Sequence, residues 1–287
     1  FAARHAVVNK EEKFALFVGE HHNVAKLRLA ELATTFDLVP PQKQDLPKEP
    51  FVGIRPFEEA DTRIFFGRSQ EIRQIRDWLN RSGQNEIKPT LILQGLSGVG
   101  KSSLLQAGLL PRLEQDWHVT YSRRDKDLGL AKQLKNACHE QLPQGKTRRL
   151  IVLDQIEECF TQPSPSTSGK PNQNPVDTSQ NLELVELVDV LQGSNDKSRR
   201  VILSLRSDWS AQVRQAFEQD SRQTQPEYIL VEGLSDRGFQ EAVLSIMRWQ
   251  ATREWYNLEI KRELVTTLRD RIVHDNSDDR TPKSVIL

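Results

Sequence analysis

The clearest chemical pattern in this sequence lies between Gly95 and Ser103. The segment GLSGVGKSS contains the spacing G-x-x-x-x-G-K-[ST], with an apolar run before it and a helical pattern after it. In such a loop backbone N–H groups surround phosphate oxygens, Lys101 approaches the terminal phosphates as a point charge, and the Ser102 hydroxyl ligates Mg²⁺. The positive end of the following helix adds to the attraction for phosphate. The predicted phosphate cradle comprises Gly95, Ser97, Gly98, Val99, Gly100, Lys101, Ser102 and Ser103.

A second motif, LIVLDQIEE, supplies the acid that a phosphate cradle needs for its metal ion. Asp154 ends an apolar run typical of a buried strand, so its carboxylate is expected at the sheet edge, where a Walker B aspartate holds the Mg²⁺ water shell. Of the next two acids, Glu157 and Glu158, one could orient or deprotonate the attacking water, or both could be first-turn acids that suit the helix dipole. Many hydrolytic P-loop proteins have glutamate where this chain has Gln155, and an amide is a poor base. We therefore expect slow hydrolysis.

An arginine ends another predicted strand, in the segment VILSLRSD. Ligands of open α/β sheets bind at the carboxyl ends of strands. At that edge, the guanidinium of Arg206 can detect a γ-phosphate by its charge and fork geometry. The alternative is a salt bridge to Asp208 or to a Walker B acid. We predict the γ-phosphate role.

These residues are placed by a regular alternation of strand and helix patterns. Strands are predicted at 90–94, 118–122, 150–154, 201–205 and 228–231, and helices with apolar stripes lie between them. Such alternation predicts an α/β fold, here a three-layer sandwich with a mostly parallel five-stranded sheet and helices on both faces. Beyond residue 235 the pattern is entirely helical.

Composition argues against several classes of function. Forty basic and forty acidic residues cancel, so no general attraction to nucleic acid or anionic membranes is expected. We interpret the basic pairs Arg123–Arg124, Arg148–Arg149 and Arg199–Arg200 as solvated surface rather than a nucleic-acid groove. No apolar run is long enough to span a membrane, and two separated cysteines favour a reducing compartment. A cytoplasmic protein without membrane or specific nucleic-acid partners is predicted.

Four segments, in order, resemble the novel STAND NTPases, the nSTAND group of P-loop proteins. They are PFVGIRPFEEADTRIFFGRSQEI (50–72), GLSGVGKSSLLQAGLLPRL (95–113), LIVLDQIEECF (150–160) and VILSLRSDW (201–209). Phe66, Gly67 and Arg68 resemble the family's h-G-R element near adenine and ribose, and GLSDRGFQEAVLSI (233–246) resembles the start of its helical lid. One departure is SRRDKDLGL, which stands where the family tends to have an R-P-G turn.

The resemblance implies an ATP-binding switch that holds nucleotide between a P-loop core and a helical lid and oligomerises when a sensor domain meets its trigger. For this chain it implies binding of Mg²⁺ with ATP or ADP, slow hydrolysis and self-association on activation. It also implies that sensor and effector domains are missing from this sequence. An N-K-x-D element for guanine is not found after any strand, so ATP is favoured. A working hydrolase and a nucleotide-stabilised scaffold stay open as alternatives, with a nucleic-acid motor weaker.

The ends of the chain differ from its middle. A strand is predicted at 13–19 and a helix at 23–36, and both precede a proline-rich stretch, interpreted as a linker. Residues 161–180 have almost no large apolar side chains and are predicted to be a disordered loop. The predicted domains are an N-terminal segment and linker at 1–49, a remnant of an upstream effector, the P-loop core at 50–234, and an incomplete helical lid at 235–287.

Overall fold

The computed structural model describes residues 41–53, 55–81, 88–113, 115–162, 181–193, 196, 198–219, 225–247, 249–257, 259–260, 263–268 and 270. The strand expected at 13–19, the helix expected at 23–36 and most of the polar loop lie outside these residues. The chain divides into two compact units, each assembled from separate stretches of sequence. The first comprises Phe1–Trp78, Ser103–Arg112 and Gly233–Leu287, and the second comprises Leu79–Ser102 and Leu113–Glu232.

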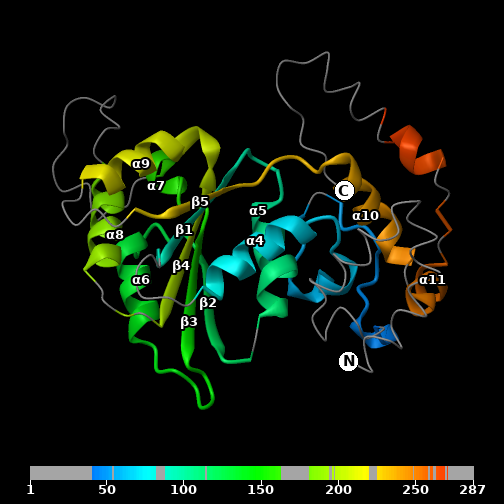
Figure 1. Cartoon of the computed structure of the whole chain (residues 1–287), viewed down its shortest axis with the longest axis horizontal. Helices are drawn as coiled ribbons and strands as arrows, with labels where there is room; N and C mark the ends of the chain where they lie inside the picture. The colour runs from blue at the N-terminus through cyan, green and yellow to red at the C-terminus, as the bar shows by residue number, and fades with distance from the viewer. Residues whose placement is uncertain are drawn as a thin grey trace. The chain divides into compact units, whose positions relative to one another are not determined.

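The second unit contains a five-stranded sheet in the order β2-β3-β4-β1-β5, in which every pair of neighbours is parallel (Figure 1). Its strands are β1 (Thr90–Gly95), β2 (Trp117–Arg123), β3 (Arg148–Asp154), β4 (Arg199–Arg206) and β5 (Glu227–Leu230). All five predicted strands are therefore confirmed, as is the α/β fold. The interior strands are near-continuous apolar runs, as expected where both faces of a parallel sheet are buried.

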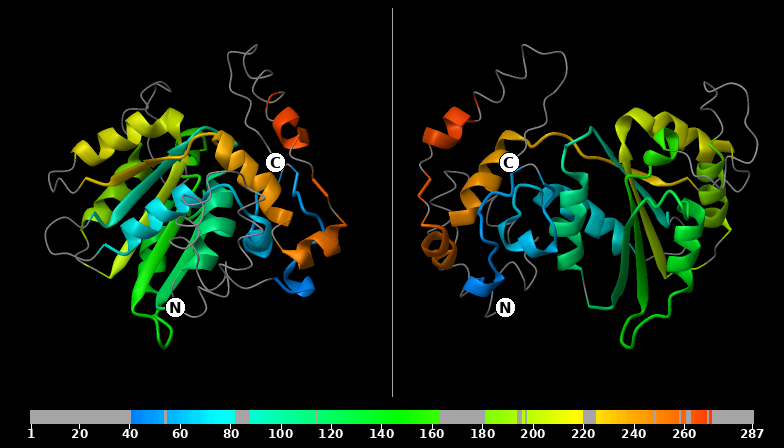
Figure 2. Two further views of the ribbon diagram at one scale, coloured as in Figure 1. Left: turned by 45° about the vertical axis from the view of Figure 1, so that its right-hand side comes forward. Right: turned by 180° about the vertical axis from the view of Figure 1, so that it is seen from behind.

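Three helices of the second unit cover one face of this sheet (Figures 1 and 2). They are α6 (Leu130–His139), α8 (Leu182–Gln192) and α9 (Ser210–Gln219). The connections from β2 to β3, β3 to β4 and β4 to β5 all run in one direction across the sheet, and right-handed crossovers therefore place their helices on the same side. A shared apolar core joins the three helices to Ile92, Ile151 and Leu203 of the sheet.

The phosphate-cradle segment joins β1 to a helix, as its motif requires. Helix α5 (Lys101–Ser103) begins at the lysine and is followed by a wider π-helical stretch, Leu104–Leu109, and a 3-10 turn, Leu110–Arg112. Pro111 lies in that final turn, where its missing N–H and fixed φ end the helical path.

The first unit is mainly helical. It contains α4 (Ser69–Leu79, its last residue beyond the unit), α10 (Asp236–Leu244), α11 (Gln250–Tyr256) and 3-10 turns at Lys43–Asp45, Glu59–Ile64 and Ser245–Met247. An apolar core within this unit includes the buried side chains of Leu46, Ile64 and Phe239. No helix in the described stretches is long and apolar enough to cross a membrane.

The proline-rich stretch, interpreted from sequence as a linker, packs within this unit where it is described. The carbonyl oxygen of Pro47 accepts hydrogen bonds from Tyr256 Oη at 2.8 Å and Trp255 Nε1 at 3.3 Å. Figure 2 shows the first described turn, in blue, beside α11, in orange. These contacts and the burial of Leu46 fasten residues 46–47 to the helical part of the unit.

The interpretation of the basic pairs as solvated surface is wrong for most of their members. Arg124, Arg149, Arg199 and Arg200 are only 3–7% exposed. Arg149 donates to the carbonyl oxygens of Ala137 and Glu140, and Arg199 donates to the carbonyl oxygen of Leu191 at 3.1 Å. Guanidinium groups here satisfy main-chain carbonyls within the fold, a role that a fork of five donors suits.

Candidate functional site

The glycines of the cradle are needed for different reasons. Gly98 and Gly100 have φ values of 73° and 95°, a left-handed conformation that residues with a Cβ rarely adopt. Gly95 instead has no space, because a Cβ would lie 2.4 Å from the carbonyl oxygen of Val231. The loop geometry therefore depends on three of its glycines, two through conformation and one through close packing.

Lys101 is held across the cradle by its own loop. Its Nζ donates to the carbonyl oxygens of Gly95 at 2.8 Å and Leu96 at 2.9 Å. Burial lowers the pKa of Lys101 below its usual value, while the acids Glu157 and Asp154 act in the opposite direction. The ammonium thus interacts electrostatically with Asp154 and Glu157, two of the three acids of the second motif.

Asp154 and Ser102 meet as the motifs predict. Ser102 Oγ donates to Asp154 Oδ2 at 2.6 Å, and the backbone N–H of Gln155 donates to Oδ1 at 3.0 Å. Tyr121, which the sequence did not single out, donates to the same Oδ2 at 2.7 Å. Burial and the nearby Asp154 charge raise the pKa of Tyr121, so its hydroxyl keeps its proton and its role as donor. The carboxylate is fully buried.

These oxygens fit Mg²⁺. A hydroxyl and a carboxylate are hard oxygen donors, and Mg²⁺ is commonly held by one or two protein groups plus waters and substrate phosphates. Among the described residues no group of three or more His, Cys, Asp and Glu side chains could enclose a metal ion. The pair Ser102 and Asp154 therefore suits a metal shared with a phosphorylated ligand, and not a closed protein cage.

The structure separates the two acids that sequence left equivalent. Glu157 is buried, and its Oε2 has no hydrogen-bond partner within the described ranges. Burial raises its pKa, and it interacts electrostatically with Lys101 and Asp154. Glu158 opens α7 (Glu158–Thr161), is less buried, and its charge acts on Arg124 instead. Glu157 is thus the acid that belongs to the cradle.

Gln155 makes the sharp turn that produces this separation. Its φ of 59° is left-handed, which is uncommon for a residue other than glycine. The next residue, Ile156, is fully buried, and its N–H donates to the carbonyl oxygen of Ser204 at 3.1 Å. The turn places Ile156 in the core and leaves Glu157 beside Lys101.

Arg206 lies beside the start of the cradle. In the parallel register of β1 and β4 it is the partner of Gly95. Its partly exposed guanidinium forms an ion pair with Asp208, the contact that sequence offered as the alternative to phosphate detection. Its position is compatible with either role, so the γ-phosphate role stays a prediction.

The predicted base-binding element, Phe66 to Arg68, belongs to the first unit. Gly67 has a φ of 88°, and a Cβ there would lie 2.4 Å from the carbonyl oxygen of Gly238 in α10. The guanidinium of Arg68 is buried and pairs with Glu71 at 2.6 Å. The adenine and ribose role of these residues stays a prediction.

Ser103, predicted as part of the cradle, is engaged within the first unit. Its Oγ accepts a hydrogen bond from the backbone N–H of Phe57 at 3.0 Å. This contact ties the start of the π-helical stretch to the segment before Glu59–Ile64.

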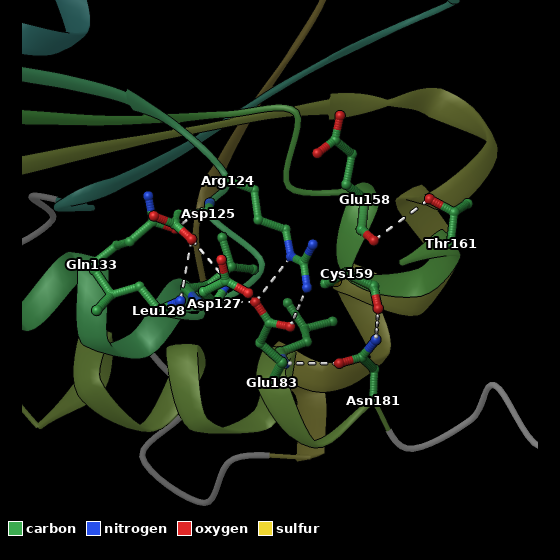
Figure 3. Close-up of polar contacts among 12 residues, drawn as sticks. Arg124, Asp125, Asp127, Leu128, Gln133, Glu158, Cys159, Thr161, Asn181 and Glu183 are labelled. Atoms are coloured by element: carbon green, nitrogen blue, oxygen red, sulfur yellow. Dashed lines mark hydrogen bonds and ion pairs between the residues drawn. The ribbon is translucent and has the colours of Figure 1, made fainter. Parts of the chain in front are cut away.

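A buried ion pair anchors the loop that follows β2, the segment SRRDKDLGL of the sequence. Arg124 donates from Nε and Nη2 to Glu183 at 3.0 and 2.8 Å, and the N–H of Leu130 donates to the same carboxylate at 2.9 Å (Figure 3). Asn181 caps α8 and donates to the carbonyl oxygen of Cys159 in α7 at 2.8 Å. No local sequence signal links Arg124 to Glu183, because the two lie 59 residues apart.

The model of the family described as Novel STAND NTPase 1 matches residues 50–278 of the chain. A search among curated proteins found no match. Among solved structures, the ORC2 protein of Aeropyrum pernix, in its ADPNP–ADP complexes, is 13% identical, with a TM-score of 0.43 over 69% of this chain and 55% of that chain. The Walker-type ATPase PABY2304 of Pyrococcus abyssi is 15% identical, with a TM-score of 0.42 over 76% of this chain and 65% of that chain.

The chain thus spans 55% and 65% of the lengths of these two similar structures.

Proposed function

Because the chain belongs to the Novel STAND NTPase 1 family, we propose that it binds ATP and ADP with Mg²⁺ and acts as a regulatory switch that hydrolyses ATP slowly. The observation that carries this proposal is the meeting of Lys101, Ser102, Asp154 and Glu157 at one edge of the sheet. We call these four residues the carboxyl edge. They combine an ammonium group that can bind phosphate, two oxygen ligands for a metal ion and a buried carboxylate that can act as a base.

Each residue of the carboxyl edge has a chemical task in this proposal. The cradle N–H groups and Lys101 bind and orient the phosphates. Ser102 and Asp154 would hold Mg²⁺, which would supply positive charge against the phosphate oxygens. Glu157, with its raised pKa, accepts the proton of the attacking water. Arg206, once released from Asp208, contacts the γ-phosphate.

Two features support slow turnover. The position directly after Asp154 is an amide, Gln155, so the base must come from Glu157 instead. Glu157 is only 9% exposed, which restricts the access of bulk water to its carboxylate. Slow hydrolysis suits a regulatory switch, in which the bound nucleotide, ATP or ADP, indicates the state of the protein.

The test is the nucleotide content of freshly purified protein, released by denaturation and identified by chromatography. We expect ADP or ATP in the parent protein and none in Lys101→Ala. Because bound nucleotide itself stabilises a fold, the variant should melt at a temperature similar to that of the parent stripped of its nucleotide. Steady-state turnover should lie well below ~1 per second, the lower end of typical enzymes. A parent that is empty and binds neither nucleotide in the presence of Mg²⁺ would refute the proposal.

We further propose that the switch acts through self-association, together with sensor and effector domains outside this chain, as the family resemblance implies. Light scattering of the protein with ADP and with a non-hydrolysable ATP analogue tests this. A larger mass with the analogue is expected, and an unchanged mass in both states would leave the family's assembly behaviour without support here.

A further inference from the structure

Tyr121 contacts the metal-binding acid from a neighbouring strand. It lies on β2, whose register pairs Tyr121 with Val152 and Arg123 with Asp154 of β3. The tyrosine therefore starts two positions before the strand end, and its long side chain reaches the carboxylate. Its hydroxyl donates to Asp154 Oδ2 at 2.7 Å, in an environment that is partly buried.

We propose that Tyr121 is a positioning residue of the metal site, which fixes the orientation of the Asp154 carboxylate toward a metal ion bound with nucleotide. The inference rests on the proposed function, because it assigns a role within the same site. Tyr121 is not expected to touch nucleotide or metal, and it acts on the site through Asp154.

The donors around Asp154 have separate tasks. Ser102 Oγ and Tyr121 Oη both donate to Oδ2, while the N–H of Gln155 donates to Oδ1. A serine hydroxyl has lone pairs for a metal and one proton to donate, so Ser102 would be shared between a bound metal and the carboxylate. The tyrosine hydroxyl adds a second donor that comes from another strand and does not depend on the cradle.

The burial of Asp154 makes the hydrogen bond from Tyr121 important. The Asp154 side chain is fully buried, so bulk water does not supply donors to orient it. Partners that hold a metal ligand in place typically affect metal affinity by about 10- to 100-fold. A rigid strand neighbour is also a more precise support than a loop residue would be.

The test compares Tyr121→Phe with Tyr228→Phe, a matched change on β5 whose ring lies beside Arg214 and not beside Asp154. Mn²⁺, which shares the oxygen preference of Mg²⁺, is titrated into each protein with saturating ADP and followed by electron paramagnetic resonance. We expect a Mn²⁺ dissociation constant raised about 10-fold in Tyr121→Phe and unchanged in Tyr228→Phe. ADP affinity in EDTA should equal that of the parent in both variants.

A second measurement separates positioning from a loss of structure. The Mg²⁺ concentration for half-maximal hydrolysis should rise by a similar factor in Tyr121→Phe, with kcat at saturating Mg²⁺ nearly retained. Unchanged Mn²⁺ affinity, or an equal loss of ADP affinity in EDTA, would overturn the inference and leave the proposed function standing. A parent protein that binds neither ADP nor Mn²⁺ would overturn both.

Discussion

Two regions of the molecule show two ways in which a sequence builds a functional feature. The carboxyl edge is built from side chains, whose charged and hydroxyl groups meet because parallel strands end together. The second region, which we call the glycine junction, consists of Gly67 and Gly238, and it contains no side chain at all. A Cβ on Gly67 would lie 2.4 Å from Gly238 O, and one on Gly238 would lie 2.8 Å from Gly67 O.

The difference teaches what each region tolerates. At the carboxyl edge an isosteric change removes chemistry and leaves the packing intact. At the glycine junction the smallest added group disturbs two backbones, although no chemistry is lost. Substitutions at the carboxyl edge should therefore impair function before folding. Substitutions at the glycine junction should impair folding first.

The largest effect is expected for Glu157→Gln. Loss of a general base typically lowers a rate by about 10²- to 10⁴-fold, and the neutral amide keeps the shape of the side chain. Single-turnover ATP hydrolysis should fall within that range, with ADP affinity and melting temperature retained. Glu158→Gln is the matched control, since Glu158 is less buried than Glu157 and its charge acts on Arg124. Equal losses in both variants would remove the distinction between the two acids.

A large loss of stability is expected for Glu183→Gln, which breaks the buried ion pair with Arg124. Breaking a buried ion pair typically costs about 3–5 kcal/mol, because the remaining charge, here Arg124, stays buried without compensation. Urea unfolding should show this loss in Glu183→Gln. The control Glu186→Gln alters an exposed acid of the same helix and should change stability by less than about 0.5 kcal/mol. If Glu183→Gln left the free energy of unfolding unchanged, hydrogen bonds, and not charge, would stabilise the loop.

The glycine junction gives a smaller and sharper test. In a helix, alanine is more favourable than glycine by about 1 kcal/mol, so Gly238→Ala would stabilise α10 if space allowed. The contact with Gly67 O does not allow it, and overpacking should cost about 1–3 kcal/mol. Gly233→Ala, where no atom lies within 4 Å of a new Cβ, is the control and should be nearly neutral. A stabilised Gly238→Ala would contradict the close approach.

The smallest expected change is a shift in pH dependence. Burial raises the pKa of Glu157, so its ionised form, which acts as the base, is lost at a higher pH than in an exposed glutamate. The rate of ATP hydrolysis should therefore rise with pH as Glu157 ionises. This rise, the acid limb of the pH profile, should occur at a higher pH than for an exposed carboxyl group. Single-turnover rates across pH measure this limb, and it should vanish in Glu157→Gln. A limb that persists in the variant would belong to another group.

Much of the fold and part of the site follow from local patterns. The five strands, the α/β class and the meeting of Ser102 with Asp154 were predicted because apolar runs and the two motifs are contiguous in sequence. The packing of Pro47 against α11 was not predicted, because its partners Trp255 and Tyr256 lie more than two hundred residues along the chain. Nor was the burial of four arginines, since adjacent basic residues resemble a solvated surface until their carbonyl partners are known.

By itself, the sequence determined the type of chemistry: a phosphate cradle, an acid for a metal ion and a parallel sheet to bring them together. Tertiary structure alone decided which acid faces Lys101, that Tyr121 holds Asp154, and that Gly67 and Gly238 touch. The reason is physical. A motif fixes the groups that neighbours along the chain present, whereas burial, pKa and close approach depend on residues that only folding brings together.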